Sequence, residues 1–148
     1  SFWVTENDYY DNKKWLKTPL MQSGNVEEKY KAVCGGIDEI TKKHGYVRNG
    51  NIYKVESESR ETVALFCHFG VECVILSHLL GISPVILWHN FCALPSSVTT
   101  LVTEEREQGK AAFRMCGFGD LSHLYAGDEE PSFQARFCET YSNFEERH

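Results

Sequence analysis

The sequence contains no long apolar run. Its longest predominantly apolar stretch, Val74–Leu80, is interrupted by Ser77 and His78. A membrane span needs about 18 or more consecutive apolar residues, so this stretch is far too short to be one. The first residues also lack the pattern of a secretory signal peptide. We therefore expect no membrane partner.

An excess of basic residues is also missing. The chain has 15 Lys and Arg against 21 Asp and Glu, which gives a formal net charge of −6 over 148 residues. Such a balance is atypical of nucleic-acid-binding proteins, and we expect no nucleic-acid partner. It leaves room for a local pocket that binds a phosphate. The length and the apolar share of 42% predict a single domain over residues 1–148, with its own core.

The cysteines form no C-x-x-C pair and match no spacing of a zinc site. Several lie in apolar stretches, where a free thiol behaves as a small core residue. We interpret them as reduced thiols of a cytoplasmic protein and expect neither a metal nor a cofactor. The six positions are Cys34, Cys67, Cys73, Cys92, Cys116 and Cys138.

The first half of the chain contains one strong helix signal and one hairpin signal. Within residues 26–44, apolar residues recur every three or four positions, and this period predicts an amphipathic helix. In "YVRNGNIYKVE", the pair Asn49-Gly50 predicts a tight turn between two short strands. Because these strands are mixed in polarity, we expect the hairpin to stand out from the body of the protein.

The stretch "TVALFCHFGVECVILSHLLG", residues 62–81, is the most informative of the sequence. Thr62–Cys67 is apolar without alternation, which is typical of a strand buried on both faces in a parallel sheet. Val71–Leu80 is predicted to be a helix that Gly81 closes. The sequence therefore places His68 between the end of a strand and the beginning of a helix.

Two further strands and a final helix are expected in the second half. Ser97–Thr103 is rich in β-branched residues, and Lys110–Phe118 reads as its returning partner across the charged turn Glu104–Gly109. The aromatic residues within Pro131–Tyr141 predict a short helix near the end of the chain. These elements, alternating with helices, indicate the α/β class.

His68 is the leading candidate for a functional residue. Open α/β sheets bind ligands at the carboxyl edge of their strands, where the prediction places this histidine. The unpaired amides of Phe69 and Gly70 would favour an anion at the beginning of the following helix. A histidine beside such a site can donate a hydrogen bond or a proton to a phosphoryl oxygen. The alternative is a core histidine whose nitrogens are satisfied locally.

The segments "TVALFCHFGVECVILSHLLG", "ALPSSVTTLVTEE" and "FRMCGFGDLSHL" resemble the C-terminal half of the histidine phosphatase (phosphoglycerate-mutase-like) superfamily. The resemblance covers residues 58–125 well. Residues 1–57 and 126–148 are also similar to one bacterial branch of that family. The resemblance implies a three-layer α/β/α sandwich and phosphoryl transfer through a phosphohistidine. Residues 1–57 would form a helical lid and hairpin insertion, 58–125 the core, and 126–148 a tail helix.

The resemblance assigns only one of the family's catalytic residues to this chain. His68 matches the family's late pocket histidine, and the amides of Phe69 and Gly70 would bind phosphate. The family's His-Gly-Gly departs here to His68-Phe69-Gly70. The Arg-His-Gly motif, which carries the family's nucleophile, occurs nowhere in the sequence. We therefore expect this chain alone to be inactive.

The missing motif leads to an expectation about partners. The chain begins at Ser1 on an aromatic-rich stretch, and it looks like the C-terminal part of a domain whose first central strand lies elsewhere. Such a loss would leave an open strand edge and exposed apolar surface. We expect the chain to pack against the missing N-terminal fragment or against another copy of itself.

Several other residues are candidates for a functional role. Tyr10 and Trp15 belong to an aromatic cluster that would cap the pocket as a substrate-selecting lid, unless it packs into the core. Cys67 could be a nucleophile only with a histidine other than His68, because successive strand residues face opposite ways. Asp120 and Glu72 are candidate acids. A structural role is favoured for His78, and similarly for His89.

These observations lead to one main prediction and one alternative. The parent protein is predicted to be a phosphoric monoester hydrolase that acts on a phosphorylated small molecule, with His68 stabilising the transferring group. The alternative is a non-catalytic module of the same fold that binds a phosphorylated ligand or a partner chain.

Overall fold

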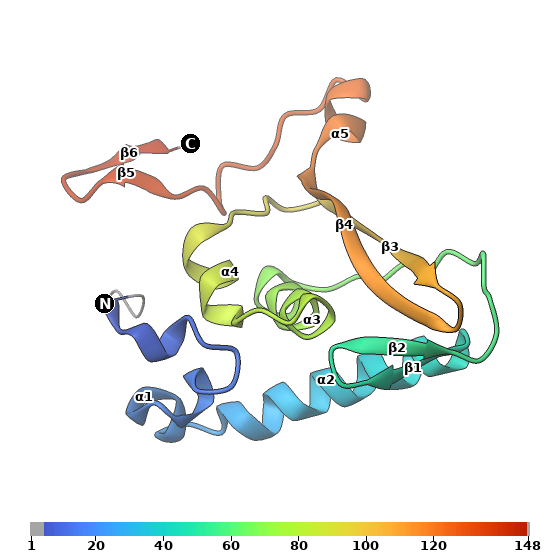
Figure 1. Cartoon of the computed structure of the whole chain (residues 1–148). Coiled ribbons are helices and arrows are strands. Elements are labelled where there is room, and N and C mark those ends of the chain that lie inside the picture. The colour runs from blue at the N-terminus through green and yellow to red at the C-terminus, as the bar shows by residue number, and fades with distance from the viewer. Residues whose placement is uncertain (1–4, 148) are drawn as a thin grey trace. The chain divides into compact units, whose positions relative to one another are not determined.

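The computed structural model describes residues 5–147 (Figure 1). It is a mixed α/β structure with a four-stranded antiparallel sheet and several helices. The chain divides into two compact units. The first comprises the described part of Ser1–Asn90 together with Thr103–Arg114, and the second comprises Phe91–Val102 with the described part of Met115–His148.

The N-terminal part of the first unit consists of short helices around an aromatic core. These are the 3-10 helices η2 (Asn7–Tyr9) and η3 (Trp15–Lys17) and the α-helix α1 (Pro19–Gln22). The Trp15 side chain is fully buried and forms edge contacts with the rings of Tyr30 and Trp88, at centroid distances of 5.0 and 5.7 Å. Together with Tyr9, Met21 and Val85 it makes one of the two cores of this unit.

The amphipathic helix predicted from the sequence is confirmed as α2 (Val26–Lys43), which buries Cys34, Ile37 and Thr41. Gly45 joins this helix to the next strand with φ +90°. A Cβ atom at this position would lie 2.1 Å from the Ser57 carbonyl oxygen, so only glycine fits. The Gly45 carbonyl accepts a hydrogen bond from the Glu56 amide at 2.8 Å, which holds both ends of the following hairpin together.

The predicted hairpin forms from β1 (Tyr46–Asn49) and β2 (Ile52–Val55), with Tyr46 opposite Val55. The expectation that it stands out from the body is wrong. β2 pairs with β4, so the hairpin is part of the main sheet, whose strand order is β1-β2-β4-β3. The physical reason is apolar burial: Tyr53 on β2 is fully buried and packs with Tyr46 and Ala111 in the second core of the unit.

Two helices follow in the first unit, α3 (Phe69–Leu80) and α4 (Pro84–Asn90). Gly81 ends α3 in the left-handed conformation at φ +72°, as expected for a C-cap glycine. α3 packs against both α2 and α4 (Figure 1). Its buried residues are Cys73, Val74, Leu76 and Ser77.

The segment before α3 differs from the prediction. Thr62–Cys67 forms neither strand nor helix, and every residue of it is exposed. Among the described residues, no hydrogen bond involves its backbone. The prediction of a buried strand is therefore wrong: no strand within residues 5–147 pairs with this segment. The apolar side chains remain in contact with solvent: the Phe66 side chain is 98% exposed.

The second predicted hairpin is present and longer than expected. β3 (Val98–Glu107) and β4 (Lys110–Asp120) are neighbours in the sheet and include most of the expected charged turn Glu104–Gly109. Gly109 makes the turn at φ +78°, and its amide donates a hydrogen bond of 2.6 Å to the Glu105 carboxylate. The first part of β3, up to Val102, and the last part of β4, from Met115, belong to the second unit.

The second unit has a short helix and a small hairpin. The helix α5 (Ser122–Ala126) comes before a two-stranded sheet of β5 (Cys138–Thr140) and β6 (Asn143–Arg147). The expected helix over Pro131–Tyr141 is therefore wrong. Thr140 lies opposite Asn143 in this hairpin, and Tyr141 and Ser142 form the turn between the two strands.

No helix in the described part of the chain is both long and apolar enough to cross a membrane. Cys34, Cys67, Cys73 and Cys92 are free thiols. The side chain of Cys138 lies outside the described residues.

Candidate functional site

His68 lies at the N-cap position of α3, with φ −114° and ψ 155°. Its backbone carbonyl accepts hydrogen bonds from the amides of Val71 and Glu72, both at 2.9 Å. Its side chain is exposed and makes no capping hydrogen bond to the helix. The imidazole is therefore open to solvent and to a ligand, and the alternative of a buried core histidine does not describe it.

The amides of Phe69 and Gly70 belong to the first turn of α3, where no carbonyl of the helix lies one turn earlier to accept from them. The Gly70 carbonyl accepts a hydrogen bond from the indole nitrogen of Trp88 at 3.1 Å, which fixes the first turn against α4. A Cβ atom added to Gly70 would meet no other atom within 4 Å. The first turn is thus held against α4, and there is open space beside the Gly70 Cα atom.

The thiols near His68 are poor nucleophiles. Cys67 is exposed, yet the partial desolvation of its thiol, followed by the neighbouring Glu72 carboxylate, raises the pKa of Cys67 above its ordinary value. Burial raises the pKa of Cys73 to about 12. Since the thiolate is the reactive form, these shifts argue against cysteine chemistry at this end of α3.

The two proposed lid residues differ in their surroundings. Trp15 packs inside the first core, because its large apolar ring is enclosed by Tyr30 and Trp88. A lid over a pocket needs an exposed face, so the core alternative describes Trp15. Tyr10 is 47% exposed and stays a candidate for ligand contact.

Asp120, a candidate acid, lies in the second unit. Its Oδ1 atom accepts hydrogen bonds from the Ser122 amide at 2.9 Å and from the Ser122 hydroxyl at 2.5 Å. These bonds lower the pKa of Asp120 below its usual value. A carboxyl group that stays ionised is a poor proton donor to a leaving group.

A cluster of polar side chains between α2, the β1–β2 hairpin and α3 was not predicted. Asp38 Oδ1 accepts a hydrogen bond from Arg48 Nε at 2.7 Å, and His78 Nε2 lies 2.9 Å from the same oxygen. Arg48 Nη2 also donates to the His78 carbonyl at 3.1 Å and to the Tyr53 hydroxyl. The Arg48 guanidinium lies over the Tyr53 ring, 4.6 Å from its centroid.

The electrostatics of this polar cluster favour a neutral histidine. Burial lowers the pKa of His78, the nearby Arg48 charge lowers it further, and the hydrogen bond to Asp38 opposes both. Because a carboxylate only accepts, His78 donates through Nε2–H to Asp38. Burial likewise raises the pKa of Tyr53 to about 12, so this hydroxyl stays protonated. The polar cluster joins three elements and has no group poised to react.

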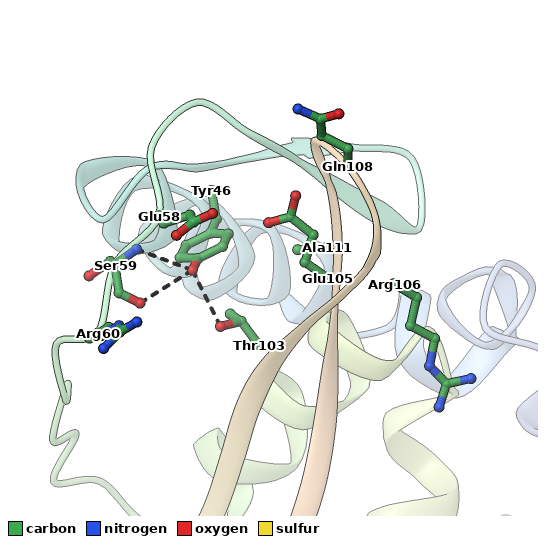
Figure 2. A pocket seen from close by; sticks show the side chains of 9 residues that line it. All are labelled: Tyr46, Glu58, Ser59, Arg60, Thr103, Glu105, Arg106, Gln108 and Ala111. Carbon is green, nitrogen blue, oxygen red and sulfur yellow. Dashed lines mark hydrogen bonds between the residues drawn. The ribbon is translucent and has the colours of Figure 1, made fainter.

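A cavity of about 380 Å³ lies elsewhere in the first unit, between the chain that follows β2 and the strand β3 (Figure 2). The Tyr46 hydroxyl lies between the segment that follows β2 and the strand β3, and it joins the two by hydrogen bonds. It donates to the Ser59 carbonyl and accepts from the Ser59 amide and the Thr103 hydroxyl, all at 3.4 Å. The remaining lining residues are Glu58, Arg60, Glu105, Arg106, Gln108 and Ala111.

The cavity is polar, and its charges are mixed. Carboxylates and guanidinium groups line it in equal number, and Arg106 forms an ion pair of 3.0 Å with Glu104. A strongly anionic ligand would meet repulsion from Glu58 and Glu105 as well as attraction. The charges that line the cavity therefore give it no net preference for an anion.

The structure brings together some of the predicted site residues. His68, Phe69 and Gly70 adjoin at the beginning of α3, as expected from their sequence positions. None of the residues proposed for catalysis, phosphate binding or the lid lines the described cavity. In the described part of the chain, no group of three or more His, Cys, Asp or Glu side chains is arranged to hold a metal ion.

Comparisons with family models, with curated proteins and with solved structures find no match for this chain.

Proposed function

We propose that this chain is the C-terminal part of a histidine phosphatase domain, in which His68 and the first amides of α3 bind a phosphoryl group. The observation that carries the proposal is an exposed imidazole directly before the open amides of a helix of 12 residues. The partial positive charge at such a helix terminus favours an anion. Hydrogen bonds from His68 would then stabilise charge on the transferring group.

The proposal extends to the fold. If Thr62–Cys67 pairs as a strand, His68 comes to the carboxyl edge of a sheet, where open α/β proteins bind their ligands. The whole domain would then be a three-layer α/β/α sandwich of the phosphoglycerate-mutase-like type. The nucleophilic histidine would come from a part of the domain outside this sequence.

A titration of this chain with inorganic phosphate, followed by NMR, tests phosphate binding. We expect the imidazole signals of His68 and the amide signals of Phe69 and Gly70 to shift in a saturable way. His123 on α5 is also exposed and serves as the matched control, so His68→Ala should abolish the saturable response and His123→Ala should leave it unchanged. Equal, unsaturable shifts at both histidines would contradict the proposal.

Activity is tested in the parent protein that contains the missing segment. Removing one preorganised donor typically lowers the rate by about 10²–10³. We therefore expect His68→Ala to lower the hydrolysis of an aryl phosphate by that factor without loss of folding. Full activity of the variant would contradict the role of His68.

A second function is favoured by one feature of the sequence, the absence of an Arg-His-Gly string. A chain without a nucleophile can bind a phosphorylated ligand without turning it over. The parent's upstream sequence distinguishes the two functions: an Arg-His-Gly after a short apolar strand supports the enzyme, and its absence there supports the binding module.

A further inference from the structure

The cavity between the segment that follows β2 and the strand β3 is a candidate site for a small ligand. All nine of its lining residues belong to the first unit, so the cavity lies within one compact body. Its volume of about 380 Å³ is at the small end of the range of about 300–1,000 Å³ that is typical of ligand pockets. Apart from Tyr46 and Ala111, every lining residue is polar or charged. We therefore expect a small and strongly polar ligand.

Three charged side chains of the lining have no charged partner within residues 5–147. Over that range, the side chains of Glu58 and Arg60 form no ion pair and no hydrogen bond. The Glu105 carboxylate accepts a hydrogen bond of 2.6 Å from the Gly109 amide and pairs with no cation of the described residues. All three side chains keep their charges available to a ligand.

The fourth charged side chain of the lining, Arg106, is already neutralised. Its Nε atom forms an ion pair of 3.0 Å with Glu104, and Figure 2 shows its side chain extending away from Tyr46, toward the right of the view. The cavity thus offers two carboxylates and one guanidinium to a ligand. The ligand of complementary charge has two cationic groups and one anionic group.

The order of the three open charges narrows the choice of ligand. In Figure 2 the Arg60 guanidinium lies on one side of the Tyr46 hydroxyl and the Glu105 carboxylate on the opposite side, with the Glu58 carboxylate between the two in this view. A basic α-amino acid carries its charged groups in the same order: the α-carboxylate, then the α-ammonium group, then the cation of the side chain.

We propose that this cavity binds a free basic α-amino acid. The Arg60 guanidinium binds the α-carboxylate, because its planar donors match two carboxylate oxygens. Glu58 binds the α-ammonium group, and Glu105 binds the side-chain cation. The Tyr46 ring offers apolar surface to the methylene groups between the two cations. Because water reaches all three ion pairs, we expect a dissociation constant on the order of millimolar.

Other small ligands satisfy fewer of these groups. A dianion would be repelled by both Glu58 and Glu105. The basic residue at the C-terminus of a polypeptide has no α-ammonium group, so it would leave Glu58 unpaired. A metal ion is not favoured either, because the described residues contain no group of three or more His, Cys, Asp or Glu side chains arranged to hold one.

An NMR titration of the chain with L-lysine tests the proposal. We expect the amide signals of Ser59, Arg60 and Glu105 to shift in a saturable way at millimolar concentrations, while those of Phe69 and Gly70 stay in place. Three analogues each lack one charge: norleucine lacks the side-chain ammonium, 6-aminohexanoate the α-ammonium and cadaverine the carboxylate. Each should bind about fivefold more weakly than lysine, the upper end for an ion pair that water reaches. Absence of saturation, or equal binding of lysine and norleucine, would overturn the proposal.

Three variants assign each charge of the ligand to one residue. Glu105→Gln should bind lysine and norleucine equally, Glu58→Gln should bind lysine and 6-aminohexanoate equally, and Arg60→Gln should bind lysine and cadaverine equally. None of these substitutions removes an ion pair within residues 5–147, and a glutamine at position 105 can still accept from the Gly109 amide.

Glu107→Gln is the matched control for these variants. Glu107 is an exposed carboxylate that pairs with Lys110 at 2.6 Å and does not line the cavity, so its variant should bind lysine like the unsubstituted chain. Unchanged lysine binding by the three cavity variants would overturn the site, and so would an equal loss in the Glu107→Gln control. The inference does not rest on phosphate binding, since His68 does not line this cavity: the phosphate titration can fail while lysine binds, and the reverse.

Discussion

Two histidines at opposite ends of α3 have contrasting surroundings. His78, in the last turn, is held against Asp38 and has a side chain only 17% exposed. His68, directly before the first turn, is exposed, and its side chain makes no hydrogen bond to the helix that follows. The C-terminal end of α3 is therefore fixed to α2 and to the β1–β2 hairpin, whereas the residue before its N-terminal end is exposed.

Replacing Arg48, at the centre of the polar cluster, should give the largest difference in stability between substitutions at the two ends of α3. Arg48→Ala removes the guanidinium partner of Asp38, whose side chain is 30% exposed, and leaves the Tyr53 hydroxyl without its donor. We expect a loss of about 2–3 kcal/mol in the free energy of unfolding, since hydrogen bonds to charged groups contribute about 1.5–3 kcal/mol. Urea unfolding followed by tryptophan fluorescence measures it.

His68→Ala is the matched control for that experiment. An exposed residue outside any network usually changes stability by less than about 0.5 kcal/mol. A loss at His68 as large as the loss at Arg48 would remove the distinction between the two ends of α3.

The pH dependence of stability should follow His78. Its pKa in the folded chain lies below the ordinary value of 6.5, so the unfolded chain binds this proton more readily. The contribution of neutral His78 to stability is therefore present above about pH 6.5 and is lost as the pH falls further. We expect the unsubstituted chain to lose more stability than the His78→Gln variant between pH 7 and pH 5. Parallel curves for the two proteins would contradict this.

The smallest effect on stability is expected in the exposed segment Thr62–Cys67. Phe66 is 98% exposed, so Phe66→Ser should leave the free energy of unfolding of this chain unchanged within about 0.5 kcal/mol. Leu76, which is 1% exposed on the buried side of α3, is the contrasting position, where Leu76→Ala should cost about 2–5 kcal/mol. Destabilisation by Phe66→Ser would indicate that the segment packs within the chain.

Sequence patterns within a short stretch of the chain predicted several of the elements. Apolar residues at every third or fourth position predicted α2, the Asn49-Gly50 pair predicted the β1–β2 hairpin, and Gly81 predicted the end of α3. The mixed α/β class followed from these elements. Their boundaries are set by glycine geometry and apolar burial, which are visible in a single sequence.

Features that depend on distant neighbours were not predictable. Asp38, Arg48 and His78 lie on three different elements and share no spacing that would reveal their contact. Thr62–Cys67 has the composition of a buried strand, yet a strand needs a partner that pairs with it. At the candidate site, the adjacency of His68 and the helix amides followed from the sequence, while the cavity bridged by Tyr46 did not.

The exposed apolar segment Thr62–Cys67 also affects how the chain behaves during synthesis. Segments of five to seven apolar residues that lack proline and charge form cross-β aggregates readily when they stay uncovered. When produced alone, this polypeptide is expected to accumulate in inclusion bodies or to occupy chaperones. Co-translation with a polypeptide that covers the stretch should raise the yield of soluble material.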